Sequence, residues 1–304
     1  MPISHVIVLG IFGLLALAII AGGTVAILAI LESRSTAFGG MSGWQTDTFR
    51  QSVPTEGLSA VRLANRNGEI VVTGEPEASA VVITAVKGAR APTPDEAREA
   101  LSEIEVITER EGDALMIRSE HPKDSQSGLS LSLLPWRIGR PKGRTYKVDY
   151  HVAVPSSFAA EAHSMNGPIR MTDLREVSLR TTNGHITVDR TDAVDARTTN
   201  GAITVDSASG PVTLSTTNGQ IRAHLTGIVR EVSISTINGS AGLTVPREVN
   251  GELDISTQNG RITVEGLDVR EPRAARNRLR GILGEGGAPI RLSTINGSVT
   301  VSAE

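Results

Sequence analysis

The most regular feature of the chain is a phrase in which apolar and polar residues alternate on both sides of an Asn-Gly pair. Between Val177 and Val264 it occurs as SLRTTNGHITV, DARTTNGAITV, TLSTTNGQIRA, SISTINGSAGL and DISTQNGRITV. Its Asn-Gly pairs follow one another at intervals of 17 to 21 residues. Repeats of about 20 residues that each hold two short alternating runs are typical of solenoids, whose stacked turns of chain, or rungs, share one core. The pattern predicts an all-β fold, with a single-stranded parallel β-solenoid (β-helix) over residues 160–304.

The same alternation predicts which side chains face the core. Side chains point to opposite faces along a strand, so residues of equal parity share a face. Counted from each Asn, the inward positions are −6, −4, −2, +3 and +5, which for Asn183 are Val177, Leu179, Thr181, Ile186 and Val188. Position −2 is Thr in most rungs, and we expect its hydroxyl to bond a carbonyl at the corner, beside a ladder of Asn side chains.

The Asn-Gly pair has two interpretations. It tolerates the positive φ that a tight solenoid corner is expected to require. It is also the favoured two-residue turn of a β-hairpin, which would give an antiparallel sheet or sandwich. The near-constant spacing and the identical inward positions of every rung favour parallel stacking.

Three further copies of the phrase lie outside the central run. They surround Asn67-Gly68, Asn166-Gly167 and Asn296-Gly297. We expect the copies at Asn67 and Asn296 to lengthen the stack at its two ends. Residues 268–288 are then an insertion that delays the last rung.

Residues 44–159 differ in sequence pattern from the repeats. They are predicted to hold the first rung and a small α+β capping unit, with a long loop at 121–143. The segment 93–104 predicts a helix with Thr93 as N-cap, Pro94 at the first position and Glu96 closing a capping box. Residues 105–110 and 114–119 alternate like a hairpin, and 80–86 and 145–154 read as strands. Such a unit would cover the apolar end of the stack and protect its edge strands.

The N-terminal region predicts a membrane anchor. Residues 6–31 contain no charge over 26 residues, against the roughly 20 that a helix needs to cross a bilayer. A cleavable signal peptide is the alternative, with Ser35-Thr36-Ala37 as its cleavage site, but the apolar run is long for one. We expect an anchor at 1–32 and a flexible tether at 33–43. The flanking charges do not themselves favour export of the remainder.

Composition narrows the chemistry. Aromatic residues make up 3% of the chain, so the core must be aliphatic, and the absence of Cys excludes disulfides and thiolate sites. A net charge of −3 argues against a nucleic-acid surface. The histidines lack metal-ligand spacing, and His185 and His224 fall at outward positions expected to be solvated. Carboxylates that could serve a glycosidase fall on expected connectors between rungs: Asp189, Asp192, Asp195 and Asp206.

No catalytic, cofactor-binding or metal-binding residue is therefore predicted. The candidates for surface binding are the basic and aromatic side chains of the two interruptions, which would suit an acidic polymer or anionic lipid headgroups if those segments are not simply solvated loops. They are Trp136, Arg137, Arg140, Lys142, Arg270, Arg273, Arg276, Arg278 and Arg280.

The recurrent T-x-N-G-x-I-x-V rungs, the run VDYHVAVP at 148–155 and the ending GILGEGGAPIRLSTINGSVTV at 281–301 resemble the DUF4097 family of bacterial adhesin-like β-solenoid proteins. That resemblance implies a non-catalytic β-solenoid at the bacterial cell membrane, anchored once and exposed on the extracytoplasmic side. The function expected is an adhesin-like binding or scaffold module, whose partner would be an envelope polysaccharide, anionic lipid or protein. A carbohydrate-active enzyme on the same fold and an envelope-stress sensor acting through a protein partner are the alternatives.

Overall fold

A computed structural model describes residues 44–120, 143–226 and 230–304, and these three ranges belong to one compact unit. The predicted anchor at 6–31, the tether at 33–43 and nearly all of the loop at 121–143 lie outside the described residues. Within those three ranges, no helix is long and apolar enough to cross a membrane.

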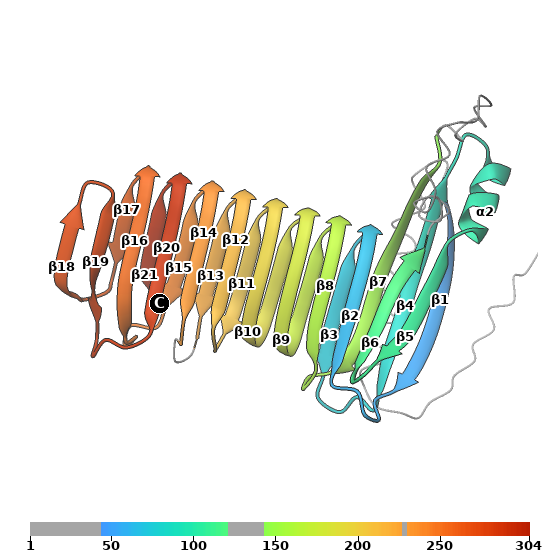
Figure 1. Ribbon diagram of the computed structural model, residues 1–304, viewed down its shortest axis with the longest axis horizontal. Helices are drawn as coiled ribbons and strands as arrows, with labels where there is room; N and C mark the ends of the chain where they lie inside the picture. Colours follow the sequence, from blue (N-terminus) through green and yellow to red (C-terminus); the bar gives the residue numbers. More distant parts are fainter. Residues whose placement is uncertain (1–43, 121–142, 227–229) are drawn as a thin grey trace, which may run out of the picture. The chain divides into compact units, whose positions relative to one another are not determined.

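Each rung consists of two strands joined at the Asn-Gly corner (Figure 1). The strands that run into the corner form what we call the leading face: β2 (Ala60–Asn67), β8 (Ala159–Asn166), β12 (Val212–Asn218), β14 (Val232–Asn238), β16 (Gly251–Asn259) and β20 (Pro289–Asn296). The strands that leave it form the trailing face: β3 (Ile70–Glu75), β11 (Ile203–Ala208), β13 (Ile221–Leu225), β15 (Ala241–Val245), β17 (Ile262–Glu265) and β21 (Val299–Ala303). Two long strands, β9 (Ile169–Asn183) and β10 (Ile186–Asn200), run from the trailing face of one rung to the leading face of the next.

Neighbouring rungs pair in parallel with like positions opposite each other. Between β9 and β10, Thr181 lies opposite Thr198 and Asn183 opposite Asn200. The two strands that flank an Asn-Gly corner belong to different faces and are not a hairpin pair. The parallel stack is therefore confirmed for these rungs, and the hairpin interpretation of Asn-Gly is wrong.

The rungs do not stack in sequence order. β20 pairs with β14 on one side and with β16 on the other, and β21 lies between β15 and β17. The last rung of the chain is thus inserted between the rungs of Asn238 and Asn259. The prediction that the Asn296 rung ends the stack is wrong, whereas β2 and β3 do form the first rung, beside β8 and β9.

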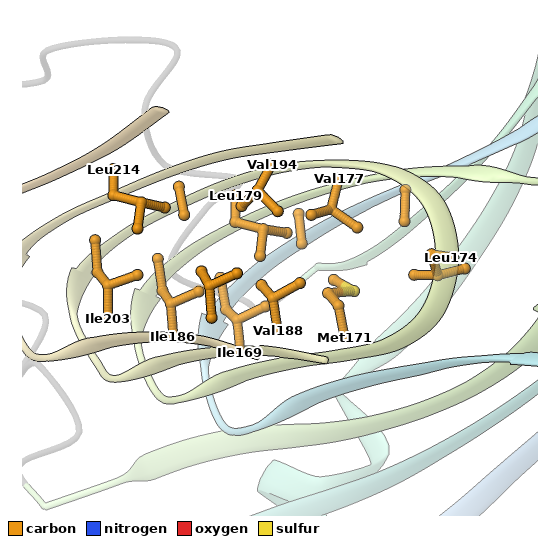
Figure 2. Close-up of a cluster of buried hydrophobic side chains, with 14 of the residues drawn as sticks. Ile169, Met171, Leu174, Val177, Leu179, Ile186, Val188, Val194, Ile203 and Leu214 are labelled. Carbon is orange, nitrogen blue, oxygen red and sulfur yellow. The ribbon is translucent and has the colours of Figure 1, made fainter. Parts of the chain in front are cut away.

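The core lies between the two faces and is aliphatic. For the rung of Asn183, Val177, Leu179, Thr181, Ile186 and Val188 are all buried, as the alternation predicts. Figure 2 shows the same arrangement in several rungs: Leu179, Val194 and Leu214 from the leading face point toward Ile169, Ile186 and Ile203 from the trailing face. Interior positions of this kind stabilise a fold by about 25 cal/mol per Å² of apolar surface removed from water.

Thr and Asn form two ladders along the corner. The Thr198 hydroxyl donates to the Gly184 carbonyl at 3.1 Å, and the equivalent bond recurs at Thr216, Thr236, Thr257 and Thr294. The Thr181 hydroxyl is buried without a partner among the described residues. In each rung after the first, Nδ2 of the corner Asn donates to Oδ1 of the corner Asn in the rung that precedes it in the stack, at 2.8 or 2.9 Å.

The corner glycines are required for close approach rather than for positive φ. A Cβ at Gly219 would lie 1.8 Å from the Gly201 carbonyl oxygen, and the other rungs show the same crowding. Only Gly68 and Gly167 of the corner glycines have positive φ. Positive φ occurs instead at the opposite corner, at Asp173 (56°), Arg190 (49°) and Ser207 (58°), so the expectation for Asn-Gly was wrong for most rungs.

The first rung is covered by strands and one helix. On the leading face β2 pairs with β6 (Ala114–Glu120), which pairs antiparallel with β5 (Glu105–Glu111). On the trailing face β3 pairs with β7 (Thr145–Pro155), followed by β4 (Ala80–Arg90) and β1 (Trp44–Pro54). The predicted hairpin at 105–119 is confirmed.

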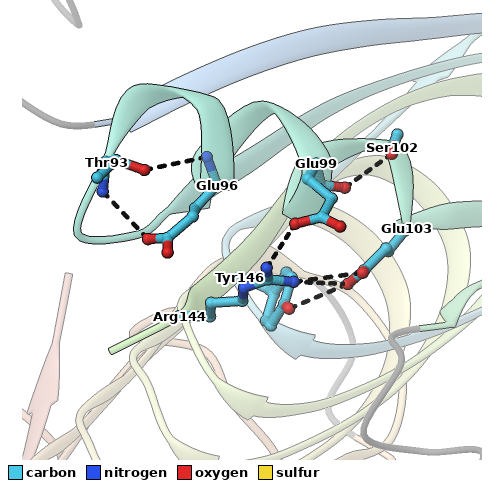
Figure 3. A network of polar contacts seen from close by, with 7 residues as sticks. All are labelled: Thr93, Glu96, Glu99, Ser102, Glu103, Arg144 and Tyr146. Carbon is cyan, nitrogen blue, oxygen red and sulfur yellow. Dashed lines mark hydrogen bonds and ion pairs between the residues drawn. The ribbon is translucent and has the colours of Figure 1, made fainter. Parts of the chain in front are cut away.

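The helix α2 (Pro94–Ser102) packs on β4 and β1 through buried Ala97 and Ala100. Its predicted capping box is present, with the Thr93 hydroxyl accepting from the Glu96 amide and the Glu96 carboxylate accepting from the Thr93 amide. Figure 3 shows Arg144 between Glu99 and Glu103, with its Nη2 2.7 Å from Glu99 Oε2. Glu99 and Glu103 raise the pKa of the Arg144 guanidinium, and these contacts tie α2 to β7.

The other end of the stack carries an antiparallel hairpin instead of a loop. β18 (Val269–Ala275) and β19 (Arg278–Leu283) extend the leading face beyond β16. The hypothesis of a solvated loop for the Arg-rich part of 268–288 is therefore wrong. The alternation of apolar and polar residues in REPRAARNRLRGIL is too weak to predict these strands. They form because β19 pairs with β16 and β18 pairs with β19.

Candidate functional site

The leading face carries an open trough along its outer surface. The trough has a volume of about 620 Å³ and crosses β12, β14, β20 and β16. Its outward-facing floor consists of a row of serines at position −3 and a second row at position −1: Ser215, Ser235, Ser293 and Ser256, then Thr217, Ile237, Ile295 and Gln258. Because adjacent strands lie about 4.8 Å apart, a ligand along the stack would meet a hydroxyl at that interval.

Two apolar side chains interrupt this polar surface. Ile237 is 43% exposed and Ile295 is 37% exposed, and they lie on the adjacent strands β14 and β20. Exposed apolar groups with a polar rim are typical of interaction surfaces. Their neighbours are uncharged, and the Ser235 hydroxyl donates to that of Ser215 at 3.2 Å. The trough therefore offers hydrogen-bond donors, acceptors and an apolar contact without a net charge on its floor.

The hairpin closes one end of the trough through Asn277 and Arg278. Arg278 contacts Asp254 with both Nε, at 2.9 Å, and Nη2, at 2.6 Å. The hydrogen bonds from Arg278 lower the pKa of the Asp254 carboxyl, and Arg280 lowers it further. Two of the predicted basic candidates are thus held by Asp254.

A second hollow lies over the outer surface of the hairpin, β16 and β20. It has a volume of about 340 Å³, and both acidic and basic side chains line it, among them Glu252, Asp254, Glu271, Arg273 and Arg280. Arg273 and Arg280 lie opposite each other in the pairing of β18 with β19. The mixed charge of this hollow does not distinguish an acidic from a basic ligand.

The candidate acidic residues lie in strands rather than on connectors, with Asp189 and Asp206 on the trailing face and Asp195 on the leading face. Asp189, Asp192 and Asp195 belong to β10, which bends at the corner opposite Asn-Gly and stays in the sheet, and Asp206 belongs to β11. Asp189 lies opposite Asp206 in the register. Each is engaged elsewhere, Asp189 with Arg190 and Asp206 with His224.

His224 is half-buried and paired rather than solvated. Its Nδ1 lies 2.8 Å from Asp206 Oδ1, and its Nε2 lies 3.4 Å from Glu304 Oε2, close enough for an ion pair though no hydrogen bond joins them. The hydrogen bond with Asp206 raises the pKa of the His224 imidazole, and Glu304 raises it further. His185 is exposed, and its Nδ1 accepts from the Ala202 amide at 3.0 Å. Across the three described ranges, no group of side chains has the composition and spacing of a metal site.

The predicted binding residues do not form one site. Trp136, Arg137, Arg140 and Lys142 lie outside the described residues. Arg270 donates to the Gly284 carbonyl, and Arg276 lies in the turn between β18 and β19. Among the candidates that the structure describes, only Arg278 reaches the trough.

The trough residues were missed, although a trace of them is present in the sequence. STINGS occurs at both 235–240 and 293–298. These two rungs, 58 residues apart, become neighbours in the stack.

The sequence model of the family described as Toastrack DUF4097 matches residues 21–302. The chain belongs to this family. Among curated proteins, none matches this Toastrack chain.

Several crystal structures match this Toastrack chain over most of its length, with low sequence identity. A "putative adhesin" from Bacteroides fragilis has 11% identity and a TM-score of 0.44, covering 86% of this chain and 97% of its own. A "putative cell adhesion protein" from Clostridium sporogenes has 10% identity and a TM-score of 0.34, covering 86% of this chain and 100% of its own. A "putative adhesin" from Parabacteroides distasonis has 10% identity and a TM-score of 0.31, covering 86% and 98%.

Proposed function

We propose that this protein is a non-catalytic, adhesin-like binding module of the bacterial cell envelope, and that the trough on the leading face is its binding surface. The observation that carries the proposal is the pair Ile237 and Ile295, exposed side by side within rows of hydroxyl side chains. Serine and threonine hydroxyls both donate and accept, which matches the hydroxyls of a sugar chain. Isoleucine offers an apolar contact to the C–H face of a sugar ring.

The ligand class that fits best is an extended, largely uncharged polysaccharide. The trough is open and its row of hydroxyls continues over four neighbouring strands, so it suits a linear polymer rather than a compact molecule. The floor lacks charge, which disfavours anionic lipid headgroups as the primary ligand. Binding through several weak contacts along a polymer gains strength from multivalency.

The test is co-sedimentation of the purified chain with insoluble bacterial envelope polysaccharides, with anionic lipid vesicles as a separate arm. Ile237→Arg combined with Ile295→Arg should weaken polysaccharide binding by about tenfold or more, equivalent to about 1.4 kcal/mol. Met165→Arg is the matched control, since Met165 is 51% exposed at the same −1 position but lies on β8, away from the trough. Equal loss in both variants, or binding to vesicles alone, would contradict the proposal.

We further propose that residues 6–31 anchor the chain and that the solenoid is extracytoplasmic. The support is the uncharged length of that segment, which suffices for a bilayer. Because the chain contains no Cys, Thr199→Cys places a single thiol at an exposed position. It should react with a membrane-impermeant maleimide in intact cells; labelling only after lysis would overturn this orientation.

A carbohydrate-active enzyme is the second candidate, and one observation favours it. Asp189 and Asp206 lie opposite each other on adjacent strands, a separation compatible with the two carboxylates of a retaining glycosidase. Their engagement with Arg190 and His224 favours a structural role. A reducing-sugar assay on the same polysaccharides separates the two functions, since an adhesin releases no sugar ends.

A further inference from the structure

The chain contains the Asn-Gly sequence at one corner of each rung, and this sequence is chemically reactive. The backbone nitrogen of the Gly can attack the side-chain carbonyl carbon of the Asn, because Gly presents no Cβ to hinder it. A five-membered succinimide forms, the Cγ–Nδ2 bond breaks and ammonia leaves. Water then opens the ring to Asp or to isoaspartate, so the net reaction consumes one water and releases one ammonia. Asn is accordingly one of the thermolabile residues of proteins.

The stack blocks this reaction at the interior corners. The attacking nitrogen must lose its proton, and at these corners that N–H is hydrogen-bonded to the Asn carbonyl of the next rung. Gly184 N–H donates to Asn200 at 3.1 Å, Gly219 N–H to Asn238 at 3.0 Å and Gly297 N–H to Asn259 at 3.1 Å. The same bond is made by Gly68, Gly167, Gly201 and Gly239. An amide held in this way reacts only after the rung opens locally.

The carboxamides at these interior corners are held as well. Asn218, for example, donates through Nδ2 to Asn200 and accepts at Oδ1 from Asn238, both at 2.8 Å. A side chain fixed at both ends cannot rotate its carbonyl carbon toward the following nitrogen. Both reacting groups are therefore immobilised wherever a rung has neighbours on both sides.

Asn259-Gly260 is the corner at which this protection ends. Its rung is the last of the stack, because the Asn296 rung is inserted before it. Among the described residues, no acceptor faces the Gly260 N–H and no donor reaches Asn259 Oδ1. Gly260 is also exposed, whereas the other corner glycines are half-buried, so water and base can reach it.

We propose that Asn259 is a site of spontaneous deamidation in the folded protein, set apart from chemically identical corners by its position at the end of the stack. Asn250-Gly251 lies outside the ladder and is expected to deamidate more slowly, because Asn250 Oδ1 accepts from the Glu285 amide at 2.8 Å and Gly251 is buried in β16.

Conversion of Asn259 removes the Nδ2 donor to Asn296 Oδ1. The new carboxylate then faces that oxygen acceptor, and isoaspartate also lengthens the main chain between β16 and β17. The modification loosens the terminal rung.

The test is peptide mass mapping of the full chain during incubation at mildly alkaline pH, with an isoaspartate methyltransferase assay as an independent readout. We expect Asn259 to convert first and Asn218 at least about tenfold more slowly, since Asn218 requires local opening. In urea all the Asn-Gly pairs should convert at similar rates, which shows that the interior pairs are competent. Asn259→Gln should abolish the early isoaspartate signal.

Two results would overturn the proposal. One is conversion of Asn218 or Asn250 in the folded chain as fast as Asn259. The other is an Asn259 that is as resistant as Asn218 in the folded chain while both convert in urea, which would show that its exposed end is held after all.

Discussion

At the scale of single residues, the corner glycines carry the tightest constraint in the stack. The backbone of one rung occupies the space where a Cβ on the next would lie, so a side chain cannot be accommodated without moving main chain. Gly219→Ala is expected to reduce the free energy of unfolding by about 1–3 kcal/mol or more, because the added carbon meets the Gly201 carbonyl at 1.8 Å. Urea midpoints measure this change.

The chain offers a matched control for that substitution. Gly242 lies in β15, and the nearest contact of an added Cβ there is at 3.8 Å. Gly242→Ala should be neutral or stabilising by about 0.4–1 kcal/mol, because alanine restricts the unfolded chain. A similar loss in both variants would mean that crowding at the corner is not what the glycine relieves.

His224 gives the molecule a predicted dependence on pH. Asp206 and Glu304 raise the pKa of its imidazole above the ordinary value. Its contribution is therefore fully present below the unfolded pKa of about 6.5 and is lost as pH rises through the folded pKa. The urea midpoint of the wild type should exceed that of His224→Gln by more at about pH 6 than at about pH 8.5. An unchanged difference would show that the pairing does not affect folding.

At the scale of elements, α2 begins at the capping box that the sequence predicts. Thr93→Ala removes the hydroxyl that accepts from the Glu96 amide and is expected to cost about 0.5–2 kcal/mol. Hydrogen exchange at the amides of Ala97 and Ala100 measures the loosening of the helix. Thr93→Ser keeps the hydroxyl and should restore protection; failure to do so would assign the effect to the lost methyl group.

The two edge strands at the hairpin end of the stack, β18 and β17, differ in how well they are protected from pairing with another strand. β18 is exposed along nearly its whole length and carries Pro272, a register shift and Glu271 with positive φ (47°). These features discourage another strand from pairing with it. β17, by contrast, pairs only with β21 among the described strands and keeps Ile262 and Val264 half-buried. The protection of the leading face is therefore built into a segment that sequence alone suggested was a loop.

At the scale of the whole molecule, the order of the rungs can be tested by crosslinking. Ser235 lies opposite Ser293, and Ser256 lies on the far side of Ser293. Adjacent strands about 4.8 Å apart satisfy the Cα separation of a disulfide, whereas strands two rungs apart do not. Since the chain has no Cys, Ser235→Cys with Ser293→Cys should form a crosslink on oxidation, seen as a mobility shift. A crosslink of Ser235→Cys with Ser256→Cys instead would restore sequence order.

Much of the fold could be predicted because its determinants are local. Alternation identified the inward set of the Asn183 rung, and the spacing of Asn-Gly identified the rungs. The helix at Thr93 was visible through its capping box. The trough was not predicted, because Ile237 and Ile295 are separated by 58 residues in the sequence. They form one exposed apolar contact only because the fold places their strands side by side. The basic hairpin was missed because its strands depend on pairing with β16 rather than on their own pattern.

The sequence by itself determined the register of each rung, since the parity of side chains along a strand is a property of the backbone. It also determined that Thr and Asn stack in ladders, because like positions must meet when identical phrases pair in parallel. Only the tertiary structure decided the order of the rungs, since any rung of this phrase can pair with any other. The insertion of 268–288 is long enough for the last rung to fold back between the rungs of Asn238 and Asn259. That choice brings the two STINGS rungs together and leaves Asn259 at the end of the stack.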